Sequence, residues 1–78
     1  ATRLVTRMRA PAAEALSPRE VEVLALVAEG LTNAEIGRAL FISETTVKTH
    51  LLRVFGKLGV SDRTAAVTTA LDRGLLVR

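Results

Sequence analysis

Apolar residues recur at helical spacing along most of this chain. Val21, Leu24, Ala25 and Ala28 lie three or four positions apart, which places their side chains on one face of a helix. Three further runs show comparable spacing, and no segment alternates between apolar and polar residues as a half-buried strand does. The pattern predicts an all-α fold, a four-helix domain over residues 16–78 with a central helix-turn-helix.

Residues suited to helix ends bound these runs. Ser17 with Glu20, and Thr32 with Glu35, each match a capping box, in which a hydroxyl and a carboxylate satisfy the first backbone amides. The third helix is capped by Ser43, and the fourth begins at Ser61 or Asp62 and runs to about Asp72. The predicted stop signals are glycines suited to the left-handed conformation, namely Gly30, Gly59 and Gly74.

The later helices have their own apolar faces. The second has a short one, made of Ile36, Ala39 and Leu40. The third has one long buried stripe, made of Val47, Leu51, Val54 and Leu58. The fourth has an apolar side made of Ala66, Val67, Ala70 and Leu71. Aromatic residues are only 3% of the chain, so the large rings available to the core are Phe41 and Phe55. Gly37 is expected to allow close approach of a neighbouring helix.

Residues 1–15 show no sustained period. They contain a proline and three arginines, and we interpret them as a linker or flexible arm, which can also touch phosphates. No secretory signal is visible and Ala1 is not a natural start, so we expect a fragment of a longer cytoplasmic protein.

Composition excludes several classes of function. The 78 residues make one small domain, and the absence of cysteine excludes disulfides and thiolate metal sites. The uncharged runs are too short to span a membrane, and one histidine cannot hold a metal alone. No acid–base pair or glycine-rich phosphate loop is present, so we predict no enzyme, no catalytic residue, no metal, no cofactor and no small-molecule ligand.

The net charge of +3 is unevenly distributed along the chain. Residues 14–47 carry six Glu against two Arg, whereas residues 48–78 carry six Lys or Arg against two Asp. A basic second half is typical of a domain that binds a polyanion, although charge alone favours the simpler explanation of a solvated surface.

The second and third helices match a helix-turn-helix, because a turn of three or four residues separates them. With the long stripe turned inward, the outer face of the third helix is short, polar and basic. Lys48 can donate to guanine, and Thr49 can bond a base or offer its methyl group to thymine. Thr46 and Arg53 suit phosphate oxygens, as do the free amides at Thr32 and Asn33.

The combination of motifs resembles the LuxR/FixJ (NarL)-type DNA-binding domain over residues 16 to about 76. The residues that carry the resemblance are the runs Leu16–Glu20, Glu29–Ile36, Ile42–His50, Lys57–Val60 and Asp62–Val67, together with Leu24. The resemblance implies four helices, the third lying in the major groove and the last making a dimer contact on DNA. Relatives commonly carry a receiver domain or an autoinducer-sensing module before this domain.

Carried over by position, the resemblance implies base reading by Lys48, Thr49 and Thr45, and phosphate contacts by Thr46 and His50. Leu52 departs from the family pattern, which commonly has a polar or basic residue there. It either presses on a thymine methyl group or lies at the groove edge. For His50 a capping or partly buried role is an equal alternative. Arg63 is expected to pair with Asp62 or with an acid on the first helix.

For the last helix, Val67, Thr68 and Leu71 are predicted to form the dimer interface, with ordinary core and surface as the alternative. The predicted function is sequence-specific binding of double-stranded DNA, as a homodimer on a two-fold-symmetric site, by the output domain of a bacterial response regulator. The alternatives are a fragment of a quorum-sensing regulator and a sigma-factor-like module that contacts RNA polymerase.

Overall fold

Each helix begins where the sequence supplies a cap. The computed structural model describes residues 16–76, so the predicted linker at 1–15 and the last two residues of the predicted domain lie outside the described part. Within it lie four helices and no strand, which confirms the all-α prediction. The helices are α2 (Pro18–Ala28), α3 (Asn33–Leu40), α4 (Glu44–Leu58) and α5 (Arg63–Asp72).

Both predicted capping boxes are present. The amide of Glu20 donates to Ser17 Oγ at 3.2 Å, while the Ser17 amide donates to Glu20 Oε1 at 2.8 Å. Thr32 and Glu35 make the same pair of bonds at the start of α3. At α5 the cap is Asp62 rather than Ser61, because Asp62 Oδ1 accepts from the Ala65 amide at 2.8 Å.

The helices α3 and α4 each end at a residue in the left-handed conformation. Gly59 ends α4 at a φ of 71°, which costs glycine little because it has no Cβ. Phe41 ends α3 at a φ of 61°, and it is the only non-glycine residue with positive φ in residues 16–76. Its side chain is 93% exposed, so the expectation that Phe41 belongs to the core is wrong. The left-handed turn directs this ring into solvent.

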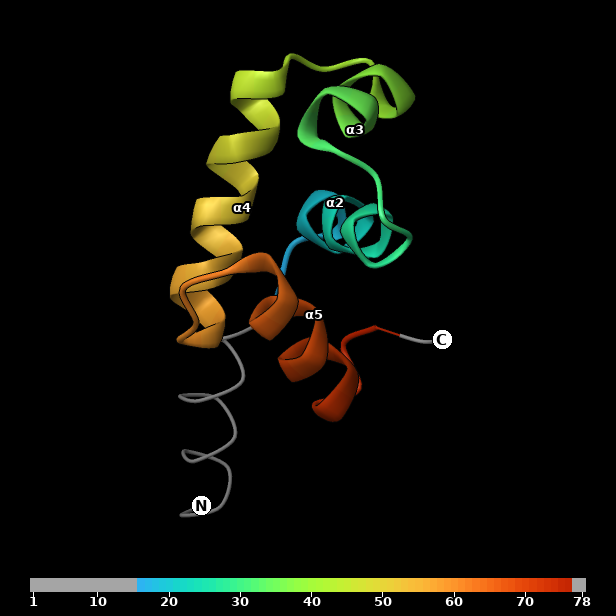
Figure 1. The fold of residues 1–78 in the computed structure, drawn as a ribbon. Helices are drawn as coiled ribbons and strands as arrows, with labels where there is room; N and C mark the ends of the chain where they lie inside the picture. The colour runs from blue at the N-terminus through green and yellow to red at the C-terminus, as the bar shows by residue number, and fades with distance from the viewer. Residues whose placement is uncertain (1–15, 77–78) are drawn as a thin grey trace.

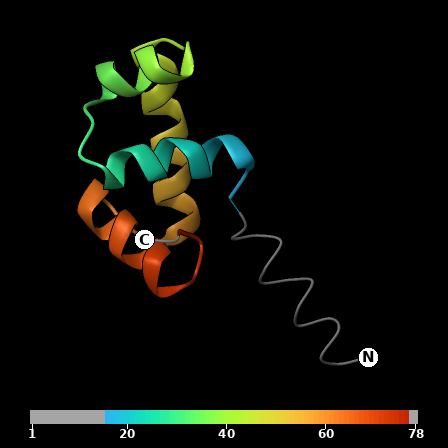
Figure 2. The same ribbon diagram turned by 90° about the vertical axis from the view of Figure 1, so that its right-hand side faces the viewer.

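α4 is the central element of the fold. Figure 1 shows α2, α3 and α5 on one side of α4, while its opposite side is left open. Turned by 90°, Figure 2 shows α2 crossing the middle of α4, with α3 and α5 near its two ends. Each of these three helices contacts α4, so one helix holds the other three together.

Two clusters of buried side chains form the core, and the predicted stripe of α4 supplies both. Val47 and Leu51 pack with Val23 and Ile36, while the second cluster comprises Val54, Leu58, Leu24, Ala66, Ala70 and Leu76. All four stripe residues are buried, as predicted. The predicted face of α2 is shifted, because Val23 is buried and Ala28 is exposed. Ala39 of α3 is exposed as well.

Gly37 allows the turn after α3 to pass close to the helix. A Cβ built at Gly37 would lie 2.7 Å from the backbone oxygen of Ile42. The close approach predicted for Gly37 is therefore to turn backbone rather than to a helix. The amide of Ile42 donates to the Gly37 carbonyl at 2.9 Å, which fixes the turn against the end of α3.

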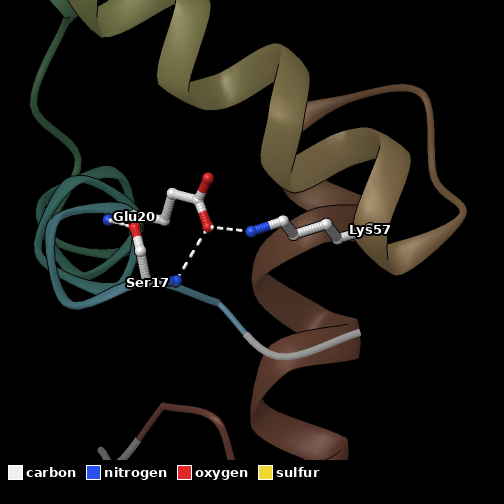
Figure 3. Close-up of polar contacts among 3 residues, drawn as sticks. All are labelled: Ser17, Glu20 and Lys57. Carbon is white, nitrogen blue, oxygen red and sulfur yellow. Dashed lines mark hydrogen bonds and ion pairs between the residues drawn. The ribbon is translucent and has the colours of Figure 1, made fainter. Parts of the chain in front are cut away.

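A partly buried ion pair joins the start of α2 to the end of α4. Lys57 Nζ donates to Glu20 Oε1 at 2.7 Å, and this oxygen also accepts the Ser17 amide, as Figure 3 shows. The Glu20 residue is 3% exposed. Burial acts to raise the pKa of Glu20, but the hydrogen bonds from Lys57 and Ser17 outweigh it and lower that pKa below 4.5.

Gly37→Ala should destabilise the domain by about 2 kcal/mol, because the new methyl group forces the Ile42 carbonyl away. Gly56→Ala is the matched control: Gly56 lies within α4 and a Cβ there meets nothing within 4 Å. The control should stabilise by about 1 kcal/mol through helix propensity. Urea unfolding measures both values, and equal effects of the two substitutions would contradict the close approach.

Glu20→Gln should cost about 2 kcal/mol at pH 7, because it removes the charge from a buried hydrogen-bonded pair. Since the folded-state pKa is lowered, ionised Glu20 stabilises the fold above pH 4.5, and this contribution disappears as pH falls through the folded-state pKa. Wild type and variant should therefore converge in urea unfolding once the pH is below the folded-state pKa of Glu20. Glu22→Gln, which removes an exposed pair with Arg19, should change stability by less than about 0.5 kcal/mol.

Candidate nucleic-acid interface

The open side of α4 presents a polar and basic surface. Its exposed side chains follow one another at helical spacing and include Thr45, Lys48, Thr49, Leu52 and Arg53. The only acid in α4 is Glu44, in its first turn, where it suits the positive end of the helix dipole. We call this surface the outer face of α4. Beyond Glu44, α4 therefore carries no acid that could neutralise the charges of Lys48 and Arg53.

Two threonines on this helix already use part of their hydrogen-bonding capacity. The Thr49 hydroxyl donates to the Thr45 carbonyl at 3.2 Å, which leaves its oxygen as an acceptor and its methyl group facing out. The Thr46 hydroxyl lies 2.9 Å from that of Ser43, the residue that caps α4. Thr46 is half-buried, so it sits at the edge of the outer face rather than on it.

His50 is half-buried, which agrees with the partly buried role left open by the sequence. Its Nδ1 atom is buried and has no hydrogen-bond partner within the described chain. A buried N–H without a partner is rarer than a buried acceptor without one. Because Nδ1 is buried, any contact of His50 with a partner molecule falls to Nε2.

The start of α3 supplies a second group of donors. Thr32 caps the helix, so the amides of Glu35 and Ile36 bond to Thr32, while those of Asn33 and Ala34 make no hydrogen bond within residues 16–76. The Glu35 carboxylate accepts from the Thr32 amide at 2.8 Å, and this bond lowers the pKa of Glu35. Thr32 is exposed and Asn33 is half-buried. Both residues lie at the helix start as predicted, but the expectation of a free amide at Thr32 is wrong, because the capping box engages it, and the free amides are those of Asn33 and Ala34.

Arg63 does not form the predicted ion pair. Its guanidinium donates from Nη1 to Asn33 Oδ1 at 2.8 Å and from Nη2 to the Leu31 carbonyl at 3.0 Å. Both acceptors are neutral and lie some thirty residues earlier in the chain. No local motif signals such a contact, because it depends on how α5 packs beside the start of α3. The sequence indicated only that an arginine with several donors would have a partner, and not which residue that partner is.

Residues from both groups meet in a shallow hollow of about 300 Å³ beside the outer face. Its walls come from α3, α4 and α5 and comprise Asn33, Lys48, Leu51, Leu52, Phe55, Asp62 and Arg63. Leu52 is 69% exposed beside it, which is unusual for a large apolar side chain. The structure thus brings Asn33 near Lys48 and Leu52, although the sequence separates them.

The predicted dimer residues lie on α5. Thr68 is exposed, whereas Val67 and Leu71 are half-buried and pack against the larger core cluster. A groove of about 260 Å³ between α2 and α5 is lined in part by Val67 and Thr68. Val67 and Leu71 therefore pack against the core with one part of the side chain and leave another part exposed, while Thr68 lies on the surface.

Residues 16–76 show neither a metal-binding cluster nor a membrane-spanning helix. No three His, Asp or Glu side chains there gather as a metal site would require. None of the described helices has the length and apolar character needed to cross a membrane.

Comparisons with known proteins agree with this geometry. Residues 14–70 match the family described as "Bacterial regulatory proteins, luxR family". The transcriptional regulatory protein LiaR of Bacillus subtilis is 56% identical over 57 residues, covering 73% of this chain and 27% of LiaR. A probable transcriptional regulatory protein NarL of Mycobacterium tuberculosis is 46% identical over 72 residues, covering 92% of this chain and 33% of that protein.

A solved structure matches as well. The response regulator ChrA, described as part of a heme-sensing two-component system, superposes with a TM-score of 0.78 at 52% identity. The match covers 80% of this chain and 31% of ChrA. The chain thus spans about a third or less of these relatives. They are named as regulators of transcription or as response regulators, and none of these names describes an enzyme.

Proposed function

This chain belongs to the luxR family of bacterial regulatory proteins, and we propose that it binds double-stranded DNA sequence-specifically by placing α4 in the major groove. The observation that carries the proposal is the outer face of α4. It is open, it is basic beyond its first turn, and it stands on a helix whose other side is locked into both core clusters.

Four side chains on this face are assigned to reading bases. Lys48 donates to guanine O6 or N7, and Thr49 accepts from a base amino group or offers its methyl group to thymine. Thr45, one turn earlier than Thr49, reads the adjoining base pair. Leu52 presses on a thymine methyl group, because its exposed apolar side chain offers no hydrogen bond.

A second set is assigned to phosphate oxygens. Arg53 and Thr46 approach the backbone from α4, and His50 donates from Nε2. At the start of α3 the donors are the Thr32 hydroxyl, the Asn33 side chain and the unbonded amides of Asn33 and Ala34, which favour an anion at the positive end of the helix. These contacts set the position of α4 in the groove, and the base-reading residues then supply specificity.

Two copies are proposed to bind a two-fold-symmetric site, with half-sites about one helical turn apart. The contact between copies is assigned to Val67, Thr68 and Leu71 on α5. In support, α5 exposes part of an apolar side that the core does not fully cover.

The complete protein is proposed to be a response regulator acting in the bacterial cytoplasm, where its DNA lies. Relatives named as response regulators favour this over an autoinducer-sensing regulator and over a sigma-factor-like module. Contact with RNA polymerase stays a prediction.

Lys48→Ala should weaken binding to duplexes selected by the wild-type chain from a random pool by about 2 kcal/mol. It should also relax base preference at one position, because the lost donor reads a base edge. Fluorescence anisotropy across a salt series measures the affinity and its salt dependence. Arg19→Ala is the control, because Arg19 lies on α2, on the covered side of α4.

Two results would contradict the assignment. If wild-type affinity for duplex DNA showed no salt dependence, DNA binding itself would be wrong, because phosphate contacts release counterions. If Lys48→Ala and Arg19→Ala bound the selected duplex equally well, α4 would not be the reading helix.

Leu52 permits a separate test that changes only the DNA. Replacing the contacted thymine by uracil removes one methyl group and should weaken binding about fourfold, which corresponds to about 0.8 kcal/mol. Each thymine of the selected half-site is replaced in turn, and the remaining thymines serve as controls. Leu52→Ala should bind thymine and uracil duplexes equally. If uracil at every position left wild-type affinity unchanged, Leu52 would lie at the groove edge instead.

A further inference from the structure

The guanidinium of Arg63 joins the first residue of α5 to the start of α3. Nη1 donates to Asn33 Oδ1 at 2.8 Å, and Nη2 donates to the Leu31 carbonyl at 3.0 Å. Both bonds are partly buried, and each spans at least thirty positions of sequence. Arg63 therefore fixes both the side-chain amide of Asn33 and the backbone at Leu31, in the connection between α2 and α3.

This contact determines which way the Asn33 amide points. A guanidinium has only donors, so it can face the oxygen of an amide but not its nitrogen. Asn33 Oδ1 must turn toward Arg63, and Nδ2 must then turn away from it. Nδ2 makes no hydrogen bond within residues 16–76, and it is not a buried atom. Its two N–H groups thus face solvent.

Asn33 lines a second hollow, of about 450 Å³, beside the start of α3. Ala34 and Arg63 line it as well, and the backbone amides of Asn33 and Ala34 make no hydrogen bond within residues 16–76. Glu44 is the acid on its wall, whereas the carboxylate of Glu35 is held by the Thr32 amide. Side-chain donors, backbone donors and a fixed cation therefore outnumber the one acid that faces the hollow.

We propose that Arg63 is a positioning residue for DNA binding: by holding Asn33 Oδ1, it turns the Nδ2 donors of Asn33 toward one phosphate oxygen. The inference rests on the proposed function and adds a residue that acts through another. Two of the five guanidinium donors of Arg63 are held by protein oxygens, and we assign its effect to the bond that it makes with Asn33. Arg63 is also the first residue of α5, the helix assigned to the dimer contact. The bond from Arg63 to Asn33 therefore links that helix to the phosphate contact.

The test uses this chain and the duplex it selects from a random pool. Each phosphate of one half-site is replaced in turn by a neutral methylphosphonate, and affinity is measured for wild type, Arg63→Met, Arg63→Lys, Asn33→Ala, Asn33→Asp and the double variant that combines Arg63→Met with Asn33→Ala. Thermal unfolding of each free variant reports the fold separately. Methionine keeps the length of the arginine without its donors, and lysine restores one donor to Asn33.

At one phosphate the methylphosphonate should weaken wild type about tenfold, as loss of a charged hydrogen bond does. Arg63→Met and Asn33→Ala should be nearly insensitive there, and the two substitutions combined should bind no worse than Asn33→Ala alone. Arg63→Lys should recover most of the sensitivity. Asn33→Asp keeps the acceptor for Arg63 and so keeps its melting temperature, but it should bind the methylphosphonate duplex more tightly than the unmodified one, because repulsion is relieved.

The proposal is overturned if Arg63→Met keeps the wild-type response at that phosphate, or if the losses from Arg63→Met and Asn33→Ala multiply. Should Arg63→Met fail to fold, Arg63→Lys and Asn33→Asp decide: an Asn33→Asp chain that still loses affinity at the methylphosphonate excludes the Asn33 contact. If the wild-type chain binds the duplex and the substitutions at Asn33 and Arg63 do not change the affinity, this inference is overturned while the proposed function stands. A wild-type chain that binds no duplex overturns the proposed function with it.

Discussion

Burial of one stripe of α4 is the constraint on which the rest of the domain depends. Val47 and Leu51 enter one core cluster, and Val54 and Leu58 enter the other. α4 thus joins both clusters, as α2 does through Leu24 and Val23, and the remaining surface of α4 is free for recognition. The same contacts that stabilise the fold also determine which side chains of α4 face outward, so stability and recognition are two consequences of one arrangement.

The acids of the first half of the chain reinforce this division. Glu20 is bonded to the Ser17 amide and to Lys57, and Glu35 is bonded to the Thr32 amide. Capping thereby places these carboxylates at helix starts and away from the outer face of α4. A modest net charge of +3 then coexists with a surface on α4 that has no acid beyond its first residue.

Local rules accounted for the helices, the capping boxes and the α4 stripe, because each depends on residues within one or two turns. They failed where geometry is set by packing. Val23 replaced Ala28 in the core because helix crossing selects the face, and Phe41 left the core because α3 ends there in a left-handed turn. The contacts of Lys57 and Arg63 span thirty or more residues, so no local pattern could reveal them. The outer face of α4 was predictable in composition, but its neighbour Asn33 was not.

The double anchoring of α4 also limits how such a domain can diverge. An α-helix turns about 100° per residue, so one residue inserted between Val47 and Leu58 would rotate half of the outer face out of phase with the other half. The same insertion would force part of the stripe out of one core cluster. Changes in length are therefore confined to the connections between helices. New sequence preferences must arise by substitution at outward positions, where a side chain can change its chemistry while the phase of the helix stays fixed.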